Sequence, residues 1–167
     1  PEAAMNMSET YKTTSIDTIV KDPVAAVGDV AAIPANILSE TYYKGEKGEE
    51  VADFSYNFKF TTNTKKTTSI YFYEAGMLRA GTATVTSDSA MTRSDTYRTG
   101  AVLSAIRDAI GDAVSTNNLV SETFYLGGKG EEIADYSYNY KVGSMTVKNV
   151  SVYYYASARA SIETDRE

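Results

Sequence analysis

The 167-residue chain contains no cysteine, no histidine and no tryptophan. Without cysteine it cannot form a disulfide framework, a thiolate metal site or a thiol nucleophile. Without histidine it lacks the side chain that most often serves as a general acid or base near neutral pH. We therefore expect a non-catalytic protein with no metal site and no cofactor.

Basic residues and long apolar runs are also scarce. The 16 Lys and Arg residues are outnumbered by 22 Asp and Glu, which gives a formal net charge of −6. An acidic chain is poorly suited to the phosphate contacts that dominate nucleic-acid binding. No apolar run reaches the roughly 18–20 residues that a membrane-spanning helix needs. We expect neither nucleic-acid binding nor membrane insertion.

The first residue is Pro1, and no signal-peptide pattern of basic, apolar and small residues follows it. We interpret this beginning as a processed or incompletely observed N-terminus. Such processing permits a removed targeting segment and leaves the compartment unknown.

Tyrosine is abundant, with 14 copies in the chain. Its ring is apolar and its hydroxyl is polar, so tyrosine suits strands, half-buried surfaces and protein interfaces. The composition favours a β-rich protein in which part of the tyrosine faces a partner.

Two long segments of the sequence match each other. Residues 39–60 (SETYYKGEKGEEVADFSYNFKF) and 121–142 (SETFYLGGKGEEIADYSYNYKV) are identical at 15 of 22 positions. The match continues upstream, where 4–13 resembles 90–99, and downstream, where 69–73 resembles 151–155. The pattern indicates an internal repeat, with a first αβ repeat over 1–86 and a second over 87–167.

A helix is expected early in each repeat. In the first, Asp22 is an N-cap residue followed by Pro23, apolar residues recur at helical spacing, and Pro34 ends the pattern. In the second, apolar residues over 102–114 follow the same spacing. The sequence predicts helices over 22–34 and 102–114.

Strands are expected after each Gly-Lys-Gly turn. Over 51–60, Phe54, Tyr56 and Phe58 alternate with polar residues such as Ser55 and Asn57, and 133–142 repeats this alternation. Period two predicts a half-buried antiparallel strand. The segments 69–73 and 151–155 are apolar on both faces, so one face is expected to meet the helix. The other face needs cover from the sister repeat or from another protein.

These elements together predict an α+β fold. Each of two similar units would pack one helix on a 3-4-stranded antiparallel sheet. An 80-residue unit is marginally stable alone, so we expect the two units to form one compact pseudo-twofold intramolecular dimer.

Aromatic and basic residues at matching places in the two repeats are the candidate partner-binding residues. Two Thr-Tyr-basic-Thr segments near the repeat starts could meet a partner, or the basic residue could protect an edge strand from aggregation. The candidates are Tyr11, Lys12, Tyr71, Tyr73, Tyr97, Arg98, Tyr153 and Tyr155.

Carboxylates are the remaining candidates for chemistry. Glu49, Glu50 and Asp53 recur at 131, 132 and 135, beside the turn of each repeat. Such a cluster could hold a hard cation or form a hydrolase site. The alternating ligand spacing of a calcium loop is missing, so a charged hairpin entry is favoured. We expect Arg79 and Arg159 to pair with these internal carboxylates.

The glycines of the two turns admit two interpretations. Gly45 and Gly48, like their counterparts at 127 and 130, could cradle a phosphate. The spacing of a phosphate-binding loop is absent and a hairpin follows in place of a helix. Tight-turn geometry is therefore the favoured explanation.

The sequence predicts a structural protein, a building block, decoration or linker subunit that bridges unlike neighbours in a virion, tail or antenna type of complex. Its partners would be other protein subunits of that assembly. The alternative is a ligand-binding module with a pocket between helix and sheet, lined by Tyr56, Tyr71, Tyr138 and Tyr153. A weaker third possibility is a carboxylate hydrolase that depends on Asp53 and Asp135.

Overall fold

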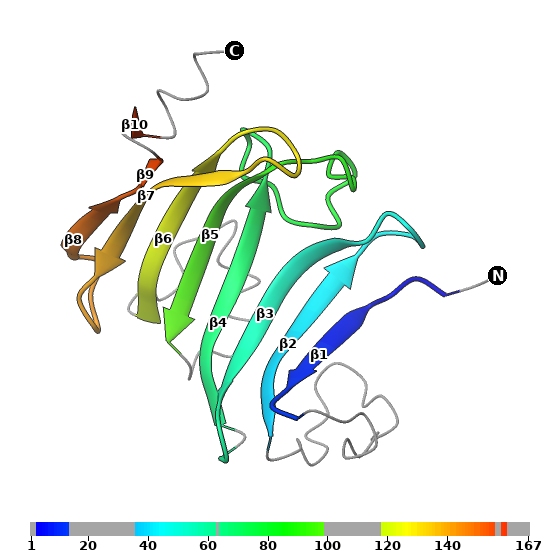
Figure 1. Cartoon of the computed structure of the whole chain (residues 1–167), viewed down its shortest axis with the longest axis horizontal. Helices are drawn as coiled ribbons and strands as arrows, with labels where there is room; N and C mark the ends of the chain where they lie inside the picture. The colour runs from blue at the N-terminus through cyan, green and yellow to red at the C-terminus, as the bar shows by residue number, and fades with distance from the viewer. Residues whose placement is uncertain (1–2, 14–35, 63, 99–117, 156–157, 160–167) are drawn as a thin grey trace.

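The computed structural model describes residues 3–13, 36–62, 64–98, 118–155 and 158–159, which form ten β-strands (Figure 1). Eight of them make one sheet, and the last two form a small separate hairpin. The strands of the sheet are β1 (Met7–Tyr11), β2 (Ile37–Lys44), β3 (Val51–Lys59), β4 (Thr64–Tyr73), β5 (Met91–Arg98), β6 (Leu119–Leu126), β7 (Ile133–Tyr140) and β8 (Val147–Val152). The hairpin consists of β9 (Tyr154–Tyr155) and β10 (Ala158–Arg159).

The sheet is an antiparallel meander in which every strand pairs with the next one along the chain. Figure 1 shows the colours running in sequence order across a curved sheet, with β1 and β8 at its opposite ends. Each connection joins neighbouring strands, so no crossover is needed.

The expected α+β architecture is wrong. The described residues contain no α-helix, and the two segments predicted to be helical, 22–34 and 102–114, lie outside them. The pseudo-twofold dimer is wrong as well. A twofold axis would place the same strand of each half side by side, whereas here β4 pairs with β5. The matching segments are therefore not two packed αβ bodies but consecutive parts of one sheet.

One face of the sheet carries the main apolar cluster. It is built from alternate residues of neighbouring strands, as period-two patterning requires. Phe54 and Ile70 are directly opposite each other on β3 and β4, and both are almost completely buried. The whole cluster comprises Ile37, Phe54, Tyr56, Phe58, Ile70 and Phe72.

The other face of β3 is also buried, which the alternation did not predict. Val51 packs there with Tyr73 and Ala80, which belong to β4 and the segment after it. Asp53 and Ser55 are buried on this face as well. Arg79 donates a hydrogen bond to Asp53, and the hydroxyl groups of Ser55 and Tyr71 are hydrogen-bonded. The prediction of a strand over this segment is confirmed, but its polar face does not face solvent.

The turns that precede β3 and β7 confirm the favoured role of their glycines. Gly45 and Gly127 have φ values of +121° and +112°, a backbone conformation that residues with a Cβ rarely adopt. A Cβ on Gly45 would lie 2.2 Å from the carbonyl oxygen of Glu49. Glycine is required there because the chain passes so close to itself.

Candidate interaction surface

The sheet has two open edges. Within the described part of the chain, β8 has β7 on one side and no strand on the other, and β1 likewise pairs only with β2. The outer side of an edge strand presents backbone N–H and C=O groups that can pair with another strand. Any surface for strand addition to the described eight-stranded sheet therefore lies along β1 or β8.

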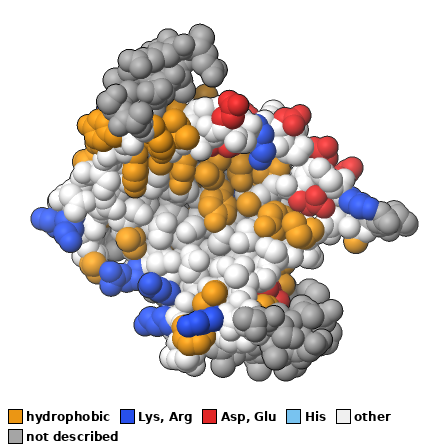
Figure 2. Space-filling model, in the orientation of Figure 1, with side chains coloured by type: hydrophobic (Ala, Val, Ile, Leu, Met, Phe, Trp, Pro, Cys, Tyr) orange, Lys and Arg blue, Asp and Glu red, His pale blue; other side chains and the backbone are white. Residues whose placement is uncertain are grey.

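The side chains of β8 are apolar and unusually exposed. Val150 is 51% exposed, Val152 38% and Tyr154, just beyond the strand, 66%. Figure 2 shows apolar side chains gathered over the β8–β9 end of the sheet. Natural edge strands are usually protected by charge, proline or a bulge, and β8 has only Lys148 among its six residues. The edge therefore has the character of an interface.

The side chains at the matching positions of β4, which has a strand on each side, are much less exposed. Thr68, Ile70 and Phe72 correspond in sequence to the three exposed residues of the β8 edge. They are 1%, 1% and 4% exposed. This difference in exposure accompanies a difference in strand pairing. β5 pairs with the outer side of β4, whereas no described strand pairs with the outer side of β8.

The tyrosines predicted to meet a partner are mostly held by internal hydrogen bonds. Tyr73 is buried and donates to the carbonyl oxygen of Ala52 at 2.7 Å, and Tyr155 donates to that of Ala134 at 2.9 Å. The hydroxyl of Tyr71 lies 2.6 Å from Ser55 Oγ, and that of Tyr153 lies 3.0 Å from Ser137 Oγ. Of these four, Tyr153 offers an exposed ring at the β8 edge.

The other predicted contact residues lie at the ends of β1 and β5. Tyr11 and Tyr97 are half-buried against the main apolar cluster, and each donates to an acidic side chain two residues earlier in its own strand. Lys12 is exposed and its Nζ lies 4.4 Å from the centre of the Phe60 ring. Arg98 is exposed at the end of β5. None of these residues belongs to the open β8 edge, although Arg98 lines an open groove together with Lys148 of β8.

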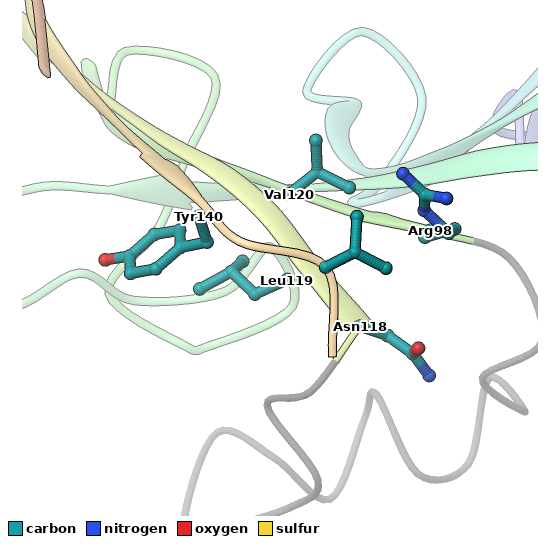
Figure 3. Close-up of a pocket in the computed structure, with 6 residues that line it drawn as sticks. Arg98, Asn118, Leu119, Val120 and Tyr140 are labelled. Atoms are coloured by element: carbon teal, nitrogen blue, oxygen red, sulfur yellow. The ribbon is translucent and has the colours of Figure 1, made fainter. Parts of the chain in front are cut away.

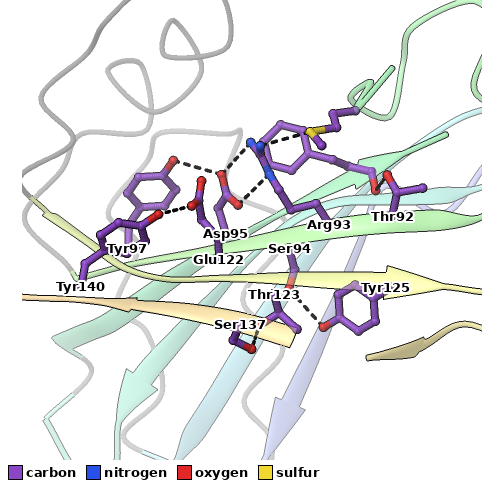
Figure 4. Close-up of polar contacts among 12 residues, drawn as sticks. Thr92, Arg93, Ser94, Asp95, Tyr97, Glu122, Thr123, Tyr125, Ser137 and Tyr140 are labelled. Carbon is purple, nitrogen blue, oxygen red and sulfur yellow. Dashed lines mark hydrogen bonds and ion pairs between the residues drawn. The ribbon is translucent and has the colours of Figure 1, made fainter. Parts of the chain in front are cut away.

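A buried ion pair on β5 was not foreseen. Arg93 Nε lies 2.9 Å from Asp95 Oδ1, and the guanidinium carbon is 4.4 Å from the Phe72 ring centre. Burial raises the pKa of Asp95 to about 6 although Arg93 opposes the shift, and nearby Glu122 adds to it. Figure 4 shows Tyr97 and Glu122 on the same side, where Glu122 accepts a hydrogen bond from Tyr140. The signal in the sequence is two opposite charges two residues apart on one strand face.

The expected internal pairs of Arg79 and Arg159 are confirmed. Arg79 Nε donates to Asp53 Oδ1 at 2.8 Å, and Arg159 Nε donates to Asp135 Oδ1 at 3.0 Å. The first pair is nearly enclosed, with 10% of the arginine side chain exposed, whereas the second arginine is 36% exposed. Both aspartates are therefore committed to structural contacts.

The glutamates of the two turns point to backbone donors. Glu50 accepts from the N–H groups of Met5 and Gly48, and these hydrogen bonds lower its pKa. Glu132 accepts hydrogen bonds from the N–H groups of Met91 and Gly130. Slight burial acts to raise the pKa of Glu132, but the backbone hydrogen bonds together have the larger effect, so its pKa is lowered. Among the described residues, no group of three or more acidic side chains is arranged to hold a metal ion.

Two hollows lie on the described surface near the start of β6 and the end of β7. One pocket, with room for about one water molecule, is lined by Arg98, Leu119 and Tyr140 among others (Figure 3). A wide open groove beside it includes Lys141 and Lys148. The tyrosines of the ligand-binding alternative do not converge on either, because Tyr56 and Tyr71 belong to clusters on opposite faces of the sheet.

Comparisons with known proteins complete this description. The described residues contain no helix with the length and apolar character needed to cross a membrane. A scan of protein-family models and searches of curated proteins and of solved structures find no match to the chain.

Proposed function

We propose that the chain is a non-catalytic structural subunit, joined to protein neighbours along the open edges of its sheet. It would serve as a building block, decoration or linker in a larger assembly. The observation that carries this proposal is the exposure of Val150 and Val152 on the edge strand β8 and of Tyr154 just beyond it, at positions whose counterparts in β4 are buried.

The physical argument rests on the cost of leaving such an edge in water. Burying an exposed valine stabilises a complex by about 1.5 kcal/mol or more, and added strand pairing supplies backbone hydrogen bonds as well. A protein neighbour offers both kinds of contact, whereas a small ligand cannot pair with the length of a strand. A subunit role therefore accounts for both the apolar side chains and the open backbone.

The acidic residues give the hydrolase alternative little support. Asp53 and Asp135 are each paired with an arginine, and Glu50 and Glu132 accept backbone hydrogen bonds. These contacts stabilise turns and strands. They leave no pair of carboxylates aimed at a common hollow among those we describe.

The proposal is tested by the mass of the native particle. Gentle extraction from the source followed by native mass spectrometry should find the 18.2 kDa chain in a larger complex of fixed stoichiometry. The variant Val152→Glu should lower the affinity for that complex at least about tenfold, because it places a negative charge where apolar contact is needed.

The matched control is Val142→Glu. Val142 is the more exposed of the two residues and lies between β7 and β8, away from the outer side of β8. This variant should assemble normally. If the wild-type chain occurs in its source only as a free monomer, the structural role is wrong.

A further inference from the structure

The chain contains its own example of how a β8-like edge is covered. Within the sheet, β4 pairs with β5 in an antiparallel register that sets Ser69 opposite Thr96 and Ile70 opposite Asp95. Residues 69–73 of β4 resemble 151–155, and residues 90–99 around β5 resemble 4–13 around β1. The two strands at the open ends of the sheet are thus close in sequence to the two strands paired at its centre.

The resemblance extends to geometry. In β1, Glu9 lies opposite Glu40 and Thr10 opposite Ser39, and the register shifts before Tyr11. In β5, the same three positions lie opposite matching residues of β6, with the register shift at the same place. Ser8 Oγ lies 3.1 Å from Tyr43 OH, as Ser94 Oγ does from Tyr125 OH. β1 therefore has the shape of β5 but lacks a described strand in the place that β4 occupies.

From this juxtaposition we infer that β1 of a second copy of the chain pairs with β8, in the register by which β5 pairs with β4. The inference rests on the proposed structural function and names its partner. Ser151 lies opposite Thr10 of the second copy, Val152 opposite Glu9, and Tyr154 opposite Met7. The interface is head-to-tail, so in a pair one copy keeps a free β1 and the other keeps a free β8 for further additions.

The side chains that differ from the central pairing fit this contact. In β5, Arg93 lies over the Phe72 ring. β1 has Met7 at the matching position, and the thioether of Met7 packs well on the exposed Tyr154 ring. Glu9 already accepts a hydrogen bond from Tyr11 at 2.8 Å, much as Asp95 accepts one from Tyr97. The carboxylate opposite Val152 thus keeps a polar partner in the assembled form.

The small β9–β10 hairpin leaves room for the added strand. In the first half of the chain, Tyr73 pairs with Leu78 in the segment that follows it and also with Met91 of β5. The end of β4 therefore pairs with the segment that follows it on one side and with β5 on the other. Tyr155, which pairs with Ala158 in the hairpin, occupies the corresponding position.

Because the chain has no cysteine, engineered cysteines report the pairing without interference. Directly opposed residues of antiparallel strands have Cα atoms about 4.5–5.5 Å apart, within the range that a disulfide bridges. Two single variants, Ser151→Cys and Thr10→Cys, are purified, mixed and oxidised mildly. Thermal unfolding of each variant by circular dichroism verifies that it keeps the fold, as expected for side chains that are not in the core.

The mixture should yield a disulfide-linked heterodimer as its main product, and each variant alone should remain largely unlinked. The double variant should give a ladder of covalent oligomers in multiples of the chain mass. A mixture of Ser151→Cys with Glu9→Cys is the matched control, because Glu9 is one residue away and points to the opposite face. It should give at least tenfold less heterodimer.

Other results overturn the inference in distinguishable ways. A homodimer from Ser151→Cys alone would mean that β8 pairs with β8, and a stronger product with Glu9→Cys would mean a different register. If no variant is linked but the native particle is large and contains other proteins, the partner is not a second copy and the proposed structural function stands. If the chain is a monomer in its source as well, both fail.

Discussion

The buried carboxylate of Asp95 ties stability to pH. Burial raises its pKa to about 6 in the folded chain, against about 3.9 in an unfolded chain. Between pH 4 and 6 the folded state therefore binds more protons at this site than the unfolded state does. The contribution of Asp95 to the free energy of unfolding thus falls as pH rises through this range.

The variant Asp95→Asn removes this titration. Relative to the variant, the wild type should lose about 2 kcal/mol of unfolding free energy between pH 4 and pH 7. Urea unfolding at a series of pH values measures the difference. Parallel stability profiles for the two proteins would show that Asp95 titrates normally in the folded state.

Two arginines in matching contacts provide a second test at the residue scale. Arg79→Met leaves Asp53 buried and unpaired, which should cost about 3 kcal/mol of unfolding free energy. Arg159→Met breaks the same contact with Asp135 at a site where the arginine is far more exposed, so solvent can replace it. Chemical denaturation should show a clearly smaller loss for the second variant. Equal losses would contradict the account of burial.

Residue patterning predicted some of these contacts and missed others. The pairing of Arg79 and Arg159 with internal carboxylates followed from a basic residue and an acidic cluster at matching places in the sequence. The ion pair of Arg93 with Asp95 did not, because the matching residues of the first segment are Met7 and Glu9. Burial of Asp53 depends on the segment after β4, which strand periodicity does not describe.

At the scale of single elements, the β2–β3 turn is sensitive at one glycine. Gly45→Ala would bring a Cβ into the Glu49 carbonyl at a strained φ, so it should cost about 2 kcal/mol or more of unfolding free energy. Gly128→Ala, in the β6–β7 turn, meets nothing within 4 Å and should change stability by less than about 0.5 kcal/mol. Thermal unfolding compares the two, and a tolerant Gly45→Ala variant would contradict the tight-turn explanation.

The strands were predictable where alternation was regular. The segment 51–59 is apolar at every second position and forms β3. Val152 and Tyr154 lie in the segment 151–155, for which the pattern predicted an apolar face in need of cover, whereas Val150 lies among polar residues and was not singled out. Whether the side chains of an edge strand are exposed depends on which strands pair with it. That pairing is determined by the whole sheet and not by a single segment of sequence.

At the scale of the whole molecule, the interpretation of the matching segments as two packed αβ units is wrong. A helix was expected to cover one apolar face of 69–73, and the sister repeat or another protein was expected to cover the other. In the structure the face that carries Tyr71 and Tyr73 packs against Val51 and the segment around Ala80. Similar segments add strands to one sheet, and this arrangement leaves a β8-like edge open at the end.

We propose that the outer side of β8 is an assembly contact. Hydrogen–deuterium exchange on the native particle, read by mass spectrometry, tests it directly, because amides in paired strands exchange slowly. The account predicts that peptides covering Val147–Val152 are protected about as strongly as those covering β4, and that dissociating the particle selectively removes the protection of β8. Rapid exchange of β8 in the intact particle, with β4 still protected, would contradict it.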